Sequence, residues 1–313
     1  MKRMFEVTSI EIETWGKNEL IESIKTTEAR TIMAETVVSV KSFVGGCSNP
    51  ETASAFGADM ITLNMFNLLE PYIMNFEDPE FEDETTSGTL QTLLADIKSK
   101  TKDINIIRRL KKRTGRFIGL NMEPIPNGIK YPEGYKLTKD NLLRVKKLGF
   151  DYIVITGNPK TMITMQGIVD GILLAKEVLG DSCLIIAGKM HGAGSGNLYK
   201  KEDMVKFAAA GADVVMIGAP LTLPGMTIDV AKEIIDAIHQ NGKLALTAIG
   251  TSQEGADRAV IEQIALASKQ AGSDIIHIGD AGFCGIADPE NIKYMSIAIR
   301  GKRHTYSRIV NRK

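Results

Sequence analysis

Short apolar runs recur along the chain, separated by longer stretches in which apolar residues return at helical spacing. Four runs follow the same phrase: an apolar residue, Gly, any residue and Asp, then a strand rich in β-branched residues. The phrases begin at Phe56, Leu148, Ala210 and Ala271. Glycine readily adopts the left-handed conformation that ends a helix, so each phrase predicts a helix end followed by a buried strand.

Each phrase places an aspartate directly before its strand: Asp59, Asp151, Asp213 and Asp274. In a barrel of parallel strands, residues at the strand starts lie on the face opposite the active site. We therefore expect these four aspartates to make capping and loop hydrogen bonds and to take no part in chemistry.

Four further apolar runs complete a set of eight, at residues 37–40, 117–121, 184–187 and 244–249. Eight strands that alternate with amphipathic stretches are typical of a parallel barrel. A doubly wound open sheet also alternates, but no GxGxxG turn follows the first strand. The pattern predicts an α/β fold, a (β/α)8 TIM barrel that forms a single domain over residues 1–313.

Two segments depart from the alternation. Residues 1–35 precede the first expected strand, and a helix from Asn18 to Thr27 is expected to cover the bottom of the barrel or extend its outer ring. Residues 65–116 form a long insertion after the second strand, with an acidic stretch at 75–84 and a basic run at 108–113. Loops after strands lie on the active face, so the insertion is interpreted as a lid, a subunit contact or a solvated excursion.

Composition narrows the class of partner. The chain has 38 basic and 38 acidic residues and a formal net charge of zero, which argues against binding to nucleic acid or an anionic membrane. Its three cysteines are scattered without CxxC spacing, which favours a reducing compartment and argues against zinc. No apolar run is long enough to cross a membrane. We expect a cytoplasmic homo-oligomer that binds a small molecule.

Candidate catalytic residues follow the expected strands, where barrel enzymes carry their chemistry. The densest group is Lys189 and His191, framed by four glycines between residues 188 and 196. A lysine there either forms a Schiff base or holds an enolate or phosphate by its charge, and a histidine moves protons near neutral pH. A solvated glycine-rich loop is the alternative. His277 lies within the last strand and is interpreted as a core histidine.

Four more polar residues follow other strands. Glu123 and Asp280 are candidate acids or bases, and Asn64 and Asn158 are candidate substrate ligands. Glu123 and Asp280 would also hold a hard cation, although HxH, HExxH and paired acidic spacings are absent. Magnesium is therefore a possible cofactor, and the sequence indicates no other.

Glycines follow the last two expected strands, and Asp288-Pro-Glu then opens a helix. Backbone amides at such a turn and helix start bind phosphate. Residues 278–290, IGDAGFCGIADPE, resemble the strand-eight ending of the ribulose-phosphate-binding barrels, and residues 249–252, IGTS, are similar to their strand-seven loop. The resemblance implies a phosphate site formed by Gly250, Thr251, Ser252, Gly279, Ala281 and Gly282.

The third strand departs from that family. Its sugar-acid decarboxylases carry Asp-x-Lys where this chain has Asn121-Met-Glu123, which argues against decarboxylation. We expect an enzyme that acts on a small phosphorylated sugar or keto acid by proton transfer or C–C cleavage next to a carbonyl, as aldolases, lyases, isomerases and epimerases do. The alternatives are a magnesium-dependent lyase or mutase of the phosphoenolpyruvate mutase/isocitrate lyase class, and a non-catalytic metabolite-binding barrel.

Overall fold

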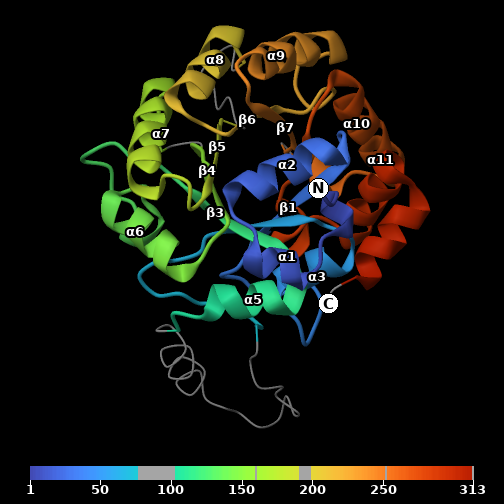
Figure 1. Cartoon of the computed structure of the whole chain (residues 1–313), viewed down its shortest axis with the longest axis horizontal. Helices are drawn as coiled ribbons and strands as arrows, with labels where there is room; N and C mark the ends of the chain where they lie inside the picture. The colour runs from blue at the N-terminus through green and yellow to red at the C-terminus, as the bar shows by residue number, and fades with distance from the viewer. Residues whose placement is uncertain (77–102, 159–160, 190–198, 251, 312–313) are drawn as a thin grey trace.

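The computed structural model describes residues 1–76, 103–158, 161–189, 199–250 and 252–311. Eight parallel strands pair in chain order, and the eighth pairs with the first to close a barrel (Figure 1). Helices surround the strands in Figure 1, as the alternation of the sequence predicts. The (β/α)8 fold is confirmed.

The strands are short and almost wholly buried, as strands covered by helices on one side and by the barrel interior on the other must be. They are β1 Thr31–Val37, β2 Met60–Asn64, β3 Phe117–Met122, β4 Tyr152–Ile155, β5 Leu184–Gly188, β6 Val214–Gly218, β7 Leu244–Ile249 and β8 Ile275–Ile278. The described α-helices are α1 Ser9–Thr14, α2 Lys17–Thr27, α3 Asn49–Ala55, α5 Ile106–Thr114, α6 Lys139–Leu148, α7 Met165–Leu179, α8 Lys201–Ala210, α9 Ile228–Gln240, α10 Arg258–Ala271 and α11 Pro289–Val310. Short 3-10 helices are η1 Met4–Glu6, η2 Glu133–Tyr135, η3 Gln253–Gly255 and η4 Phe283–Gly285.

The first strand begins earlier than the apolar pattern predicts. The expected strand at 37–40 is wrong beyond its first residue, because β1 ends at Val37. Glu35 interrupts the apolar run and conceals the strand in the sequence, yet its side chain is buried in the barrel. The last part of the predicted insertion at 65–116 is helix α5, which packs against α3 and β3 as a helix of the outer ring. The acidic part of the insertion lies mostly outside the described residues.

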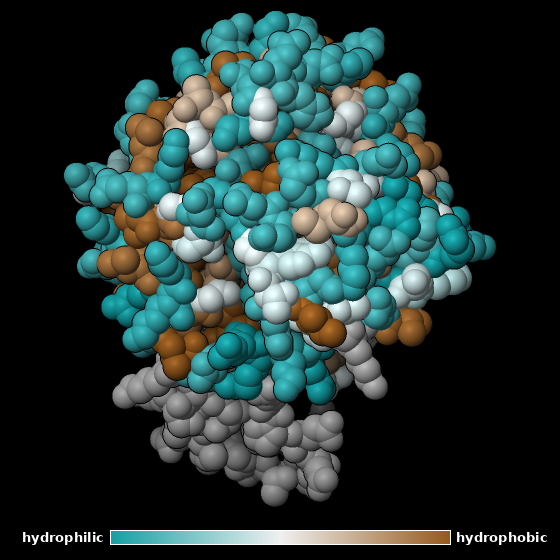
Figure 2. All heavy atoms as spheres, in the orientation of Figure 1, coloured by the Kyte–Doolittle hydropathy of each residue, from teal (hydrophilic) through white to brown (hydrophobic). Residues whose placement is uncertain are grey.

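The lower half of the barrel interior is apolar. Inward side chains such as Met33, Met60 and Phe117 form one cluster with residues of the N-terminal segment, among them Leu20 and Ile24 of α2. Helix α2 lies across this end of the barrel in Figure 1, which confirms the predicted cover. Figure 2, in the same orientation, shows a mainly hydrophilic outer surface over it.

The ring of Tyr152 fills the middle of the barrel. A Cβ built on Gly119 would lie 2.2 Å from this ring, so glycine is required there by close packing. The Tyr152 hydroxyl is 3.1 Å from the Thr62 hydroxyl, which satisfies both buried groups. Above this level the inward side chains become polar.

The four aspartates of the repeated phrase bind the strands together at the lower rim. Each carboxylate accepts a hydrogen bond from the amide of the second residue of the preceding strand, and each aspartate amide donates back to the carbonyl of that residue. The amide-to-carboxylate pairs are Ile32–Asp59 at 2.9 Å, Ile118–Asp151 at 2.8 Å, Ile185–Asp213 at 2.9 Å and Ala245–Asp274 at 2.8 Å. The preceding glycines are left-handed, with φ between 80° and 115°. The predicted structural role of these aspartates is confirmed.

A cationic side chain lies beside each of these carboxylates. Lys111 faces Asp151, Lys17 faces Asp213 and His239 faces Asp274; these pairs join a helix to the rim. Asp59 differs because two arginines of α11 reach it, Arg300 at 2.6 Å and Arg308 at 2.9 Å, and all three side chains are wholly buried. Burial lowers the pKa of Arg308 to about 10, although Asp59 acts against this shift.

No helix among the described residues has the length and apolar character needed to cross a membrane.

We expect Asp59→Asn to lower the free energy of unfolding by about 3–5 kcal/mol, because it leaves two buried guanidinium groups without their counter-charge. Urea unfolding followed by circular dichroism measures this loss. The control is Asp203→Asn, which breaks an exposed pair with Lys206 and should cost about 0–1 kcal/mol. Equal losses for the two variants would contradict a special role for Asp59.

Candidate active site

A buried carboxyl–imidazole pair occupies the upper end of the barrel interior. Glu35 of β1 and His277 of β8 point inward by the alternation of their strands, and Glu35 Oε2 lies 3.2 Å from His277 Nε2. The side-chain amide of Asn121 donates to Glu35 Oε1 at 2.5 Å. The side chains of Glu35 and His277 are only 5% and 3% exposed, so protein partners must replace the hydrogen bonds that water would supply.

Asp280 lies just beyond β8 and beside this pair. The amide nitrogen of Asn64 donates to its Oδ2 at 2.8 Å. Burial raises the pKa of Asp280 to about 7, and the charges of Glu35 and Glu254 add to this, whereas Asn64 and His277 oppose it. A carboxyl with this pKa exists in both protonation states near neutral pH, which suits an acid or base in catalysis.

Glu254 of η3 adds another carboxyl to the group. It is 3% exposed, and burial raises its pKa, with the charge of Glu35 adding to the effect. Its Oε2 and the Nδ1 of His277 have no hydrogen-bond partner within the described part of the chain. Two polar atoms without partners in a buried group are unusual in a folded protein.

A pocket of about 250 Å³ opens beside these residues. Its walls come from the ends of β2, β3 and β4 and the loop after β3: Asn64, Met65, Asn121, Glu123, Tyr131, Pro132, Tyr135 and Asn158. Asn64 and Asn121 line this pocket and also bind Asp280 and Glu35. The pocket therefore lies next to the carboxyls of Asp280 and Glu35, each of which is hydrogen-bonded to an asparagine of the pocket wall.

Glu123 forms the charged part of the pocket wall. Its Oε1 accepts hydrogen bonds from the Tyr131 hydroxyl at 2.8 Å and from the Asn158 side chain, and its Oε2 accepts one from the Asn158 amide at 3.3 Å. Burial and the nearby Glu123 carboxylate raise the pKa of the Tyr131 hydroxyl well above its usual range. Tyr131 is therefore a hydrogen-bond donor at this wall.

The structure brings together some of the candidates that the sequence indicates. Asn64, Glu123 and Asn158 line the pocket, and Asp280 contacts Asn64 behind it. Lys189, the residue after β5, does not line this pocket, and its amine donates to the carbonyl of Ile163 at 3.1 Å.

His191 and Thr251 lie outside the described residues. The amide of Gly279 donates to the carbonyl of Ile249 at 2.9 Å and so belongs to the pairing of β7 with β8. Ser252 is left-handed, with φ 78°. A Cβ on Gly282 would lie 2.2 Å from the carbonyl oxygen of Ile286, so close packing within the chain requires this glycine. The phosphate site, which would also involve Gly250 and Ala281, stays a prediction.

Sequence reasoning missed Glu35, Tyr131 and Glu254. A lone acid between apolar residues is the signal for Glu35, because a charge within a buried strand needs a partner there. His277 is a core histidine as interpreted, but its partner is a carboxylate at the barrel mouth.

The described residues do not form a metal site with protein ligands alone. Within the described ranges no three His, Cys, Asp or Glu side chains come together as a metal-ion site. Both oxygens of Glu123 accept hydrogen bonds from the protein.

The comparisons with known proteins give a family. Residues 5–312 match the family model described as a domain of unknown function, DUF7916, and the chain belongs to this family. No curated protein matches the chain.

Solved structures share the fold. The carboxyl transferase domain of Rhizobium etli pyruvate carboxylase with pyruvate has 13% identity and a TM-score of 0.52, over 96% of this chain and 52% of that one. The chain thus spans about half of that domain structure. Thiamine phosphate pyrophosphorylase from Pyrococcus furiosus has 13% identity and a TM-score of 0.47, over 87% and 96% of the two chains. At 13% identity the similarity to the carboxyl transferase domain shows the barrel fold alone.

We expect the elevated pKa of Asp280 to make stability depend on pH. A folded-state pKa near 7, above the ordinary 3.8, stabilises the folded protein at low pH, and this contribution is lost as the pH rises through 7. Asp280→Asn lacks the titration, so wild type should lose stability relative to this variant between pH 4.5 and 8. Urea unfolding of both proteins at the two pH values measures the difference. Parallel behaviour of the two would show that the pKa of Asp280 is ordinary.

Proposed function

We propose that this DUF7916 protein is an enzyme that transfers a proton at a carbon next to a carbonyl group, with a small polar substrate bound in the pocket between Asn64 and Asn158. The proposal depends on one observation: Asp280, which accepts a hydrogen bond from Asn64 of the pocket wall, has a pKa of about 7. Such a group accepts a proton from carbon and returns it without a change of pH.

The neighbours of Asp280 have supporting roles in the proposal. Burial and the negative charge of Glu35 oppose the ionisation of Asp280 and so keep its carboxyl available as an acid, whereas His277 acts against them. Asn64 donates to Asp280 and sets the direction of its carboxyl group. Glu123, Asn158 and Tyr131 form a hydrogen-bonded wall against which hydroxyl groups of a substrate would be placed.

The proposed substrate is a small phosphorylated sugar or keto acid, and the reaction is of the isomerase, epimerase, aldolase or lyase type. The phosphate group of the proposed substrate rests on the loops after β7 and β8, whose sequences resemble those of the ribulose-phosphate-binding barrels. Lys189 does not line the pocket and donates to the carbonyl of Ile163, so the proposal assigns proton transfer to Asp280 and gives Lys189 no role in it.

A magnesium-dependent lyase or mutase is the second candidate. Four carboxyls, those of Glu35, Glu123, Glu254 and Asp280, lie at this end of the barrel, and such a concentration of negative charge favours a hard cation. Magnesium is commonly held by one or two carboxylates together with substrate oxygens, so a three-ligand protein site is not required.

We expect Asp280→Asn to lower kcat/KM by 10²–10⁴-fold on any substrate that the protein converts, because it removes the proton-transferring group and keeps its shape. A panel of phosphorylated sugars and keto acids, each with its unphosphorylated counterpart, identifies the substrate by NMR. Assays with EDTA and with added magnesium separate the two candidates.

The matched control is Asp203→Asn, which changes a partly exposed carboxyl of α8 that does not line the pocket and should leave kcat/KM unchanged. Wild-type turnover in Asp280→Asn would refute the proposal. Failure to convert any member of the panel would favour a metabolite-binding barrel without catalysis.

A further inference from the structure

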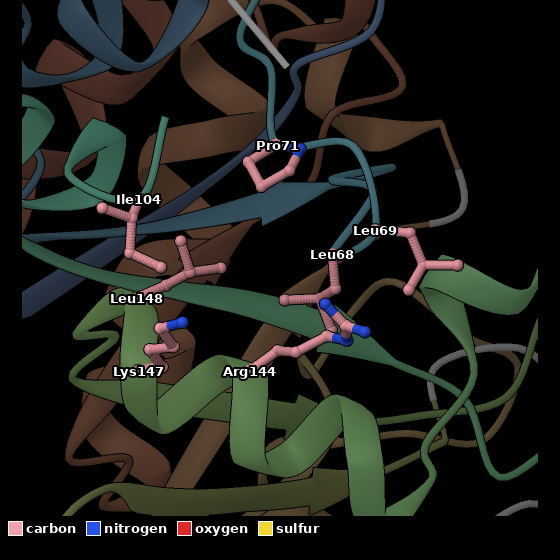
Figure 3. Close-up of a pocket in the computed structure, with 7 residues that line it drawn as sticks. All are labelled: Leu68, Leu69, Pro71, Ile104, Arg144, Lys147 and Leu148. Atoms are coloured by element: carbon pink, nitrogen blue, oxygen red, sulfur yellow. The ribbon is translucent and has the colours of Figure 1, made fainter. Parts of the chain in front are cut away.

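A second pocket, of about 220 Å³, lies on the flank of the barrel (Figure 3). It is formed by the loop after β2, the residue that precedes α5 by two positions, and the last turns of α6. Its lining residues are Leu68, Leu69, Pro71, Ile104, Arg144, Lys147 and Leu148. None of them lines the pocket at the barrel mouth, so the two hollows are separate.

The interior of this pocket is apolar and firmly held. Leu68 and Leu148 belong to the hydrophobic core and form its floor. The Leu68 amide donates to the carbonyl of Gly134 at 3.1 Å, which fixes the loop after β2 against the loop after β3. Leu69 and Ile104, by contrast, are 45% and 42% exposed. Two large apolar side chains that face a hollow in water gain free energy when an apolar body covers them.

The rim of the pocket is cationic. Arg144 and Lys147 are three residues apart on α6, so they lie on the same face of that helix. Figure 3 shows Arg144 extending from α6 toward the loop that carries Leu68. Neither cation has an ion pair with any residue of the described chain.

Among the described residues, no acid forms an ion pair with either of the two cations. Asp103 forms an ion pair with Arg109. The charge of Glu70 acts on Tyr135, which lies on the side of the barrel mouth. The rim therefore presents two positive charges above an apolar floor.

We propose that this pocket is a second small-molecule site, which takes an anion with a compact apolar body such as an aromatic or branched aliphatic carboxylate. The carboxylate would bind Arg144 and Lys147, because a guanidinium makes paired hydrogen bonds to a carboxylate and an ammonium adds a point charge. The apolar body would lie between Leu69 and Ile104. Inorganic phosphate alone would leave this apolar surface uncovered.

The test uses the full chain and 2-naphthoate as the probe, with binding measured by calorimetry. Arg144→Gln and Lys147→Gln should each weaken binding by about tenfold, through loss of a charge-assisted hydrogen bond. Lys146→Gln is the matched control, since it removes a neighbouring charge of α6 that does not line the pocket. Asn121→Ala alters the barrel mouth and should also leave the affinity unchanged.

The neutral probe 2-naphthamide should bind at least tenfold more weakly than 2-naphthoate. Absence of 2-naphthoate binding to the wild-type protein, equal affinity for the two probes, or equal effects of Arg144→Gln and Lys146→Gln would overturn the proposal. Loss of binding in Asn121→Ala would do the same, because it would place the probe at the barrel mouth.

Discussion

The reciprocal pairing of an aspartate with the second residue of the preceding strand is the constraint on which the barrel depends. It occurs four times, in every second pair of neighbouring strands, and it fixes the register of β1 with β2, β3 with β4, β5 with β6 and β7 with β8. A buried carboxylate that accepts from a backbone amide and faces a cation has few other arrangements that satisfy it. The carboxylate of Asp59 also binds two buried arginines of α11, Arg300 and Arg308, and so holds this helix against the lower rim.

Because the strands are held together at the lower rim and by the apolar interior above it, the upper end of the barrel can hold polar groups. Along the inward face of the strands, apolar residues such as Met33 give way to Thr62 and Tyr152 and then to Glu35, Asn121 and His277. The lower half supplies the hydrophobic burial, and the upper half holds buried charges that cost stability. Such a concentration of buried charge at the strand ends, beside a pocket, is typical of a functional site.

Much of the fold could be predicted from the repeated phrase, because its glycine and aspartate have specific conformational roles. The first strand could not be placed correctly, since Glu35 breaks its apolar run. The cost of burying this carboxyl is offset by Asn121 of β3 and His277 of β8, which are remote in the sequence. Lys189 illustrates a different limit: its position after β5 predicts catalysis, but only the folded structure shows that its amine donates to the carbonyl of Ile163. Tyr131 and Glu254 lie on connections whose paths depend on tertiary packing, such as the contact of Gly134 with Asn67.

In the proposed reaction the Asp280 carboxyl moves a proton between the substrate carbon and solvent. The decisive measurement is NMR of a converted substrate in D₂O. Deuterium from the solvent should appear at the carbon next to the carbonyl, with a rate that falls about 10²-fold or more in Asp280→Asn. Complete conversion in D₂O with no deuterium at that carbon would contradict it.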